Sequence, residues 1–202
     1  MAPPNAEPSV ARVPLDQEQV VDAAAALANS EGLDALTLTR VAKVLGVRQP
    51  ALYRHVESYQ DLLRLLGLRG REQLLAALSE AAIGVAGDEA VGAVGWAWRE
   101  TVLANPGLYE ATDRYPCAGD EELEEAVERI VGVIAQALAG FDLEDDHRAH
   151  AARALRSAFH GFCHLESGDG HPHPHDPDDT FEGLIELLCA GIRSQTMARQ
   201  MA

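Results

Sequence analysis

The segment from residue 36 to 56, LTLTRVAKVLGVRQPALYRHV, holds the residues whose types and spacing suggest chemistry. It contains four cations, Arg40, Lys43, Arg48 and Arg54, and no acidic residue. The whole chain has 202 residues and a formal net charge of -16. A protein that is acidic overall repels nucleic acid unless its positive charge is concentrated in one place. The segment is therefore a candidate for binding phosphate and base edges.

The same segment has the pattern of two short helices joined by a tight turn. Either Thr37 or Thr39 can cap the first helix, and Gly46 lies where the turn needs a positive φ. Pro50 falls in the first turn of the second helix, where a missing N–H costs nothing. We interpret the segment as a DNA-binding helix-turn-helix, in which the N-terminus of the second helix enters the major groove.

Charge is distributed unevenly along the chain. Residues 1–70 contain seven cations and eight acids, whereas the remainder contains nine cations and twenty-four acids. The acidic rear should repel DNA and so orient the front of the molecule toward it. The alternative is that the acidic excess only keeps the protein soluble. Both interpretations are compatible with a DNA-binding front.

Composition restricts the class of protein. Hydrophobic residues make up 47% and aromatic residues 5% of the chain, and the three cysteines are scattered without a CxxC motif. This pattern fits a reducing cytoplasm and indicates no disulfide framework. No apolar run is long enough for a transmembrane helix, and the N-terminus lacks the apolar core of a signal peptide.

The spacing of apolar residues predicts an all-α fold of about nine helices and no strand. We expect a disordered N-terminal arm over residues 1–14, a helix-turn-helix domain over 15–60 and a helical ligand-binding and dimerisation domain over 61–202. The expected helices cover residues 16–29, 37–45, 50–55, 59–83, 88–104, 106–113, 120–140, 143–167 and 179–194.

The front of the chain resembles the TetR family of transcriptional repressors. The matching residues are LDQEQVVDAAAALANSEGLDALTLTRVAKVLGVRQPALYRHVESYQDLL, with LTLTRVAKVLGV, PALYRHV and DLL in the family's order and spacing. Farther along, ANPGLYEAT, ALRSAFHGFCHLESG and DDTFEGLIELLCAGI resemble, more loosely, the WHG-type C-terminal domain of that family. The resemblance implies a homodimeric repressor that binds a palindromic operator and is released by a small-molecule effector.

Arg48 and Gln49 are expected at the N-terminus of the reading helix. Arginine suits the two acceptors of guanine, glutamine can pair with adenine, and the small Ala51 can touch a thymine methyl group. The resemblance implies phosphate contacts for Tyr53 and His55, although both could instead fill the core of the head. Where the family often has a lysine that touches phosphate, this chain has Tyr59. The predicted DNA-contacting residues are Thr37, Thr39, Arg48, Gln49, Pro50, Ala51, Tyr53, Arg54, His55 and Tyr59.

The resemblance also implies a ligand pocket and a dimer interface in the rear domain. For the pocket we expect Trp96, Arg99, Leu103, Leu108, Tyr109, Tyr115, Phe159 and His160, although each apolar member could be ordinary core. For the interface, in which the last two long helices pack against their copies, we expect Leu155, Phe159, Phe162, Cys163, Phe181, Leu184, Leu188 and Ile192.

Two other classes of function are open at this point. Seven of the eight histidines follow residue 146, and His160 and His164 have the i, i+4 spacing of metal ligands on a helix. A metal-responsive regulator is therefore an alternative, although no cysteine lies at ligand spacing and the preferred prediction includes no metal and no cofactor. A helical interaction protein that does not bind DNA is a second alternative. No GxSxG, GxGxxG, P-loop or HExxH motif suggests an enzyme.

Overall fold

A computed structural model describes residues 14–168, 170 and 174–200, so nearly all of the expected N-terminal arm lies outside the described residues. Within this part of the chain there is no strand, which confirms the all-α prediction. The eight α-helices are α1 (Gln17–Glu31), α2 (Leu38–Val44), α3 (Tyr59–Ala81), α4 (Asp88–Ala104), α5 (Pro106–Arg114), α6 (Glu121–Ala137), α7 (Asp145–Ser167) and α8 (Pro177–Gln200). Three short 3₁₀ helices are η1 (Leu33–Ala35), η2 (Gln49–Arg54) and η3 (Leu138–Gly140).

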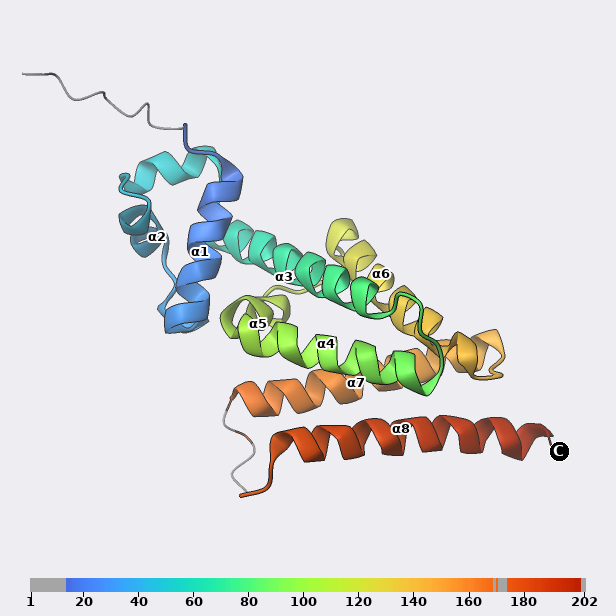
Figure 1. Cartoon of the computed structure of the whole chain (residues 1–202). Coiled ribbons are helices and arrows are strands. Elements are labelled where there is room, and N and C mark those ends of the chain that lie inside the picture. Colours follow the sequence, from blue (N-terminus) through green and yellow to red (C-terminus); the bar gives the residue numbers. More distant parts are fainter. Residues whose placement is uncertain (1–13, 169, 171–173, 201–202) are drawn as a thin grey trace, which may run out of the picture.

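The head of the molecule, shown at the left of Figure 1, consists of α1, η1, α2, η2 and the first turns of α3. A capping box starts α1, since the Asp16 carboxylate accepts from Gln19 N at 2.8 Å and Gln19 Oε1 accepts from Asp16 N at 3.2 Å. Val20, Ala24 and Leu27 then follow at helical spacing and are buried in the head core. Local signals in the sequence thus fix this helix.

The turn between α2 and η2 is built as the sequence predicts. Gly46 has φ of 64°, and Val47 N donates to Ala42 O across the turn at 3.0 Å. The second helix differs from the expected α-helix because η2 is a 3₁₀ helix of six residues. Its flanking bonds span three residues, as in His55 N to Leu52 O at 2.8 Å. Leu52 anchors η2 because it is fully buried in the head core.

Helix α3 runs from the head into the rear body (Figure 1). Ser58 caps it by accepting from Asp61 N at 3.0 Å, as the sequence predicts. Leu62 and Leu66 of α3 lie in the head core, whereas Leu74 and Leu78 lie in the body core. The predicted domain boundary at residue 60 therefore falls in the first turn of a helix that belongs to both cores, and any tilt of α3 moves the head with it.

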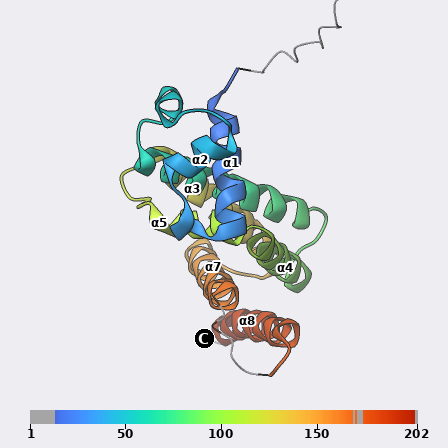
Figure 2. The ribbon, with the colours of Figure 1, turned by 90° about the vertical axis from the view of Figure 1, so that its left-hand side faces the viewer.

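The body packs around a second hydrophobic core contributed by α3, α4, α5, α6, α7 and α8. Trp98, Phe159 and Phe181 lie at its centre, each with at most 2% of the side chain exposed. Helices α7 and α8 lie side by side along the lower edge in Figure 1, and the end-on view of Figure 2 shows α8 outermost. None of the helices in the described part of the chain is long and apolar enough to span a membrane.

Helix α5 connects the body to the head. Leu108 and Ala111 of α5 belong to the head core. A β-carbon at Gly107 would stand only 2.1 Å from Ala28 O, so the backbones of α1 and α5 are in close contact. The Asn29 side chain joins the same contact by accepting from Leu108 N at 2.8 Å. Head and body are thus held together at a backbone contact that tolerates little movement.

Candidate DNA-reading surface and effector cavity

The cation-only segment reaches the surface of the head. Lys43, Arg48 and Arg54 are exposed, and no ion pair engages any of the three within the described residues. Arg40 differs, because its guanidinium pairs with Glu31 of α1 and donates to Ala35 O at 3.1 Å. Three of the four cations are therefore available to phosphate or base edges, and the fourth braces the head.

A chain of hydrogen bonds organises the surface around the start of η2. Thr39 Oγ1 donates to Gln49 Oε1 at 2.8 Å, and Gln49 Nε2 donates to the Tyr53 hydroxyl at 3.3 Å. Thr37 caps α2 by accepting from Arg40 N at 3.3 Å. The bond from Thr39 joins α2 to η2 at Gln49, the residue that follows the exposed Arg48.

The other predicted DNA-contacting residues lie at different depths. Tyr53 is 52% exposed and Arg54 is exposed, whereas Ala51 and His55 are half-buried. The structure places Pro50 on the surface in the first turn of η2. Tyr59 packs partly against the head core, and this burial raises the pKa of its phenol. Direct contact of all these residues with DNA stays a prediction.

Tyr109 and His160 of the predicted effector pocket meet in the body. The Trp98 indole donates to the Tyr109 hydroxyl at 3.0 Å, and that hydroxyl lies 2.7 Å from His160 Nδ1. Burial raises the pKa of Tyr109 and lowers that of His160, so a protonated phenol donating to a neutral imidazole fits both groups. Asp113 Oδ2 lies 3.6 Å from the other ring nitrogen of His160. The four side chains form a polar relay between α4, α5 and α7.

This relay borders a cavity of about 30 Å³ between α3, α4, α5, α6 and α7. The volume suits about one water molecule. Trp98, an aromatic residue that the sequence also offers as pocket lining, is part of its wall, whereas sequence reasoning missed Arg71, Leu74, Thr112, Asp113, Val127, Ile130 and Arg156. A signal for one of them was present, because Arg71 lies three residues before Leu74 and seven before Leu78, on the same apolar face of the helix.

Other residues predicted for the pocket lie outside this cavity. Leu108 is in the head core, and Leu103 is 45% exposed on α4. Trp96 faces α8, where its ring packs edge-on against Phe181 at 5.1 Å between centroids. Arg99 pairs with Glu166 at 2.6 Å and with Asp178 at 2.7 Å, and so ties α4 to α7 and α8. Tyr115 is half-buried beyond the end of α5, and Phe159 is core; neither borders the cavity.

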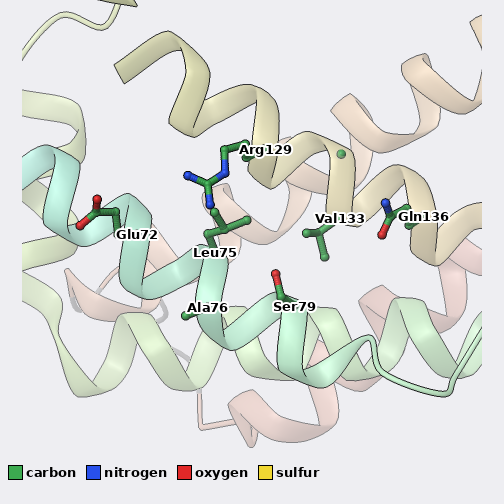
Figure 3. Close-up of a pocket in the computed structure, with 8 residues that line it drawn as sticks. Glu72, Leu75, Ala76, Ser79, Arg129, Val133 and Gln136 are labelled. Carbon is green, nitrogen blue, oxygen red and sulfur yellow. The ribbon is translucent and has the colours of Figure 1, made fainter. Parts of the chain in front are cut away.

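A larger hollow lies on the outside of the body between α3 and α6 (Figure 3). It has a volume of about 560 Å³ and an apolar floor that includes Leu75 and Val133. Glu72 and Arg129 lie toward one end and Ser79 near its middle. None of the residues predicted from the sequence lines this groove, so it does not correspond to the expected pocket.

The structure corrects six of the eight residues predicted for the dimer interface. Leu155, Phe159, Phe162, Cys163, Phe181 and Ile192 are all at least nine-tenths buried within the single chain, and Leu184 and Leu188 are half-buried. They pack toward the body core because that side of α7 and α8 faces α4. Among the described side chains of these two helices, the exposed large hydrophobic ones are instead Leu165, at 50%, and Leu187, at 74%. Dimerisation itself stays a prediction.

The histidines form no evident metal site in the described residues. No group of three or more His, Cys, Asp or Glu side chains there could hold a metal ion. The rings of His160 and His164 stack at 5.9 Å between centroids, but Nδ1 of His160 is engaged by Tyr109. His171 and His173 lie outside the described residues.

The two parts of the chain match two sequence families. Residues 20–66 match the family described as bacterial regulatory proteins, tetR family, and residues 91–188 match the tetracyclin repressor-like C-terminal domain. The chain is 33% identical over 190 residues to an HTH-type transcriptional regulator of Mycobacterium tuberculosis, covering 93% of this chain and 87% of that protein. It is 29% identical to the HTH-type transcriptional regulator YobS of Bacillus subtilis, covering 90% and 94% of the two chains.

Solved structures share the fold. A Rhodococcus protein of unknown function has a TM-score of 0.75 at 20% identity, covering 91% of this chain and 98% of that chain. A possible TetR family regulator of Streptomyces coelicolor has a TM-score of 0.69 at 22% identity, covering 89% and 99%. Both matched families are described as regulatory or repressor-like proteins. From its two matched domains and its relatives, the chain belongs to the TetR family of DNA-binding transcriptional regulators.

Proposed function

We propose that this regulator is a homodimeric repressor that binds a palindromic operator through Arg48, Gln49 and the surrounding surface. The observation that carries the proposal is the set of exposed cations, Lys43, Arg48 and Arg54, on the head of an otherwise acidic protein. Two copies related by a two-fold axis would present this surface to two half-sites. The effector would bind in the body and favour a dimer whose heads are wrongly spaced for the operator.

Two relatives support a small-molecule effector. Over 54 residues, this chain is 44% identical to the class D tetracycline repressor of Escherichia coli, and this match covers 27% of this chain. The fold is shared with a TetR variant of Acinetobacter baumannii solved in complex with minocycline, at a TM-score of 0.67 and 23% identity. The small cavity beside Tyr109 and His160 is the place where we propose that an effector enters.

Replacing Arg48 with alanine is expected to relax sequence specificity. An arginine paired with guanine discriminates against other bases by about 1–3 kcal/mol, so the variant should lose up to roughly a hundredfold in preference. The measurement is fluorescence anisotropy with the operator, first selected by the wild-type protein from a random library, and with scrambled DNA. Affinity of the wild type for the operator should also fall steeply with salt.

Lys43→Ala is the matched control for this experiment. Lys43 is an exposed cation on α2 and is expected to contact the DNA backbone. Its loss should weaken binding to operator and scrambled DNA alike and reduce the salt dependence. If Arg48→Ala and Lys43→Ala changed operator and scrambled DNA by the same factor, Arg48 would not read bases.

Replacing Leu187 with glutamate is expected to convert the dimer into a monomer. Leu187 is 74% exposed on α8, and no atom lies within 4 Å of where a β-carbon would stand on Gly183, Gly191 or Gly161. This outer face of α7 and α8 suits a second copy, and two new carboxylates near the two-fold axis would repel each other. Sedimentation velocity measures the result. Ile83→Glu, at a site 77% exposed beyond α3, should leave the dimer intact. A wild-type monomer, or a dimeric L187E protein, contradicts this interface.

A further inference from the structure

Arg71 is a buried cation without a carboxylate partner. Its side chain is 7% exposed in the middle of α3, and no ion pair involves it in the described structure. The guanidinium donates from one terminal nitrogen to Gly67 O at 2.9 Å and from the other to Thr112 O at 2.8 Å. Arg64 and Arg99, by contrast, are each paired with carboxylates at hydrogen-bonding distance. The positive charge of Arg71 is solvated inside the protein by backbone carbonyls.

These two carbonyls are dipoles and carry no net charge, so the positive charge of Arg71 is solvated by the backbone but is not paired with an anion. A guanidinium has five N–H donors in a planar fork that matches the two oxygens of a carboxylate, and two of its nitrogens are engaged here. Burial lowers the pKa of Arg71, which reflects the cost of removing its charge from water. An arginine nevertheless stays protonated, so the buried guanidinium keeps its charge without an anionic partner, and the desolvation cost remains. A bound anion would relieve it.

The cavity beside Arg71 has the matching chemistry. Arg71 and Arg156 contribute two positive charges to its wall against one carboxylate, Asp113, which lies beside His160. Arg156 has no ion pair among the described residues. The rest of the wall combines two hydroxyl groups with an apolar lining of Leu74, Trp98, Val127 and Ile130. In a chain of net charge -16, this interior wall carries an excess of positive charge.

We propose that the effector of this regulator is an apolar carboxylate whose carboxyl group pairs with Arg71 and whose hydrocarbon part lies against the apolar wall. The proposal deepens the proposed function, since it rests on this cavity being the effector site. Because the cavity of about 30 Å³ has room for about one water, α3 and α5 must separate when the ligand enters. The carboxylate would compete with Thr112 O for Arg71 and so loosen the bond between α3 and α5.

The contact between α3 and α5 involves the two helices that connect the body to the head. Helix α3 leads into the head core, and α5 packs against α1 through Gly107 and Leu108. A ligand that prefers the separated arrangement of α3 and α5 would therefore also bias the orientation of the head. Release of DNA by the same compound is the expected functional consequence.

The test compares acids with their uncharged amides on the full-length protein. The probes are benzoate with benzamide, phenylacetate with phenylacetamide, and hexanoate with hexanamide, each at concentrations up to about 20 mM so that millimolar affinities are detected. Melting temperature and isothermal titration calorimetry report binding. At least one acid should raise the melting temperature by more than its amide does, and Arg71→Met should weaken its binding by at least about tenfold. Arg129→Met, which removes an exposed cation outside the cavity, should leave binding unchanged.

Each other outcome overturns the proposal. One such outcome is that no acid stabilises the wild type more than its amide does. The other is that Arg71→Met binds the acid as tightly as the wild type. The acid–amide comparison on the wild type needs no variant, so it decides the matter even if Arg71→Met fails to fold. DNA binding is measured separately on the selected operator. If the protein binds the operator tightly but binds no acid, the anionic effector is refuted and the repressor function is not. If an acid binds but does not release DNA, its binding site is not the effector site, and the proposal is refuted as stated.

Discussion

Replacing Gly107 with alanine should destabilise the protein and weaken its binding to DNA. The added methyl group would stand 2.1 Å from Ala28 O and 2.8 Å from Asn29 N, which are backbone atoms that cannot rotate away. Overpacking of this kind costs about 1–3 kcal/mol, and the clash outweighs the gain of up to about 1 kcal/mol that alanine brings to a helix. Helices α1 and α5 would have to move apart, and the head would turn relative to the body.

Thermal unfolding and operator binding by anisotropy measure the two consequences. Gly132→Ala is the matched control, because Gly132 is also helical but no atom lies within 4 Å of where its β-carbon would stand. That variant should be as stable as the wild type or more so, and should bind DNA normally. Equal behaviour of G107A and G132A would show that the contact between α1 and α5 does not set the position of the head.

Replacing Phe159 with alanine should give the largest loss of stability. Phe159 is fully buried, with its ring centroid 5.8 Å from that of Phe181 and 6.4 Å from that of Trp98. Truncating a buried phenylalanine costs about 3–5 kcal/mol, through lost burial and the cavity left behind. Urea unfolding followed by circular dichroism measures the change in the free energy of unfolding. The loss should be the same at two protein concentrations, because the side chain acts within one chain.

Leu165→Ala is the control for this experiment. Leu165 lies on the same helix but is 50% exposed, so its truncation should lower the free energy of unfolding much less than the truncation of Phe159 does. The comparison also separates two interpretations of Phe159 that its sequence position leaves open. If the wild type were a dimer and F159A dissociated it while the stability of the isolated chain stayed unchanged, Phe159 would belong to an interface and not to the core.

The sequence by itself determined the helical fold and the layout of the head. Its signals there are local: the capping box of Asp16 and Gln19, the positive φ required at Gly46, and the proline in the first turn of η2. Each acts over a few residues and therefore can be read without knowing the rest of the fold. The cation-only composition of residues 36–56 is equally local, and the structure leaves Lys43, Arg48 and Arg54 exposed. The 3₁₀ form of η2 was missed because so short a helix has few bonds to distinguish the two types.

Only the tertiary structure decided which partner covers each apolar face in the body. Helical spacing groups Leu155, Phe159 and Phe162 on one face, but the same spacing would serve a core, a ligand pocket or a second copy. The structure places these residues against the body core and leaves Leu165 and Leu187 outside. Likewise, Tyr109 meets His160 and Arg71 meets Thr112 across separations of 51 and 41 residues. Such contacts depend on how whole helices pack, because periodicity along one helix carries no information about the helix that lies opposite it.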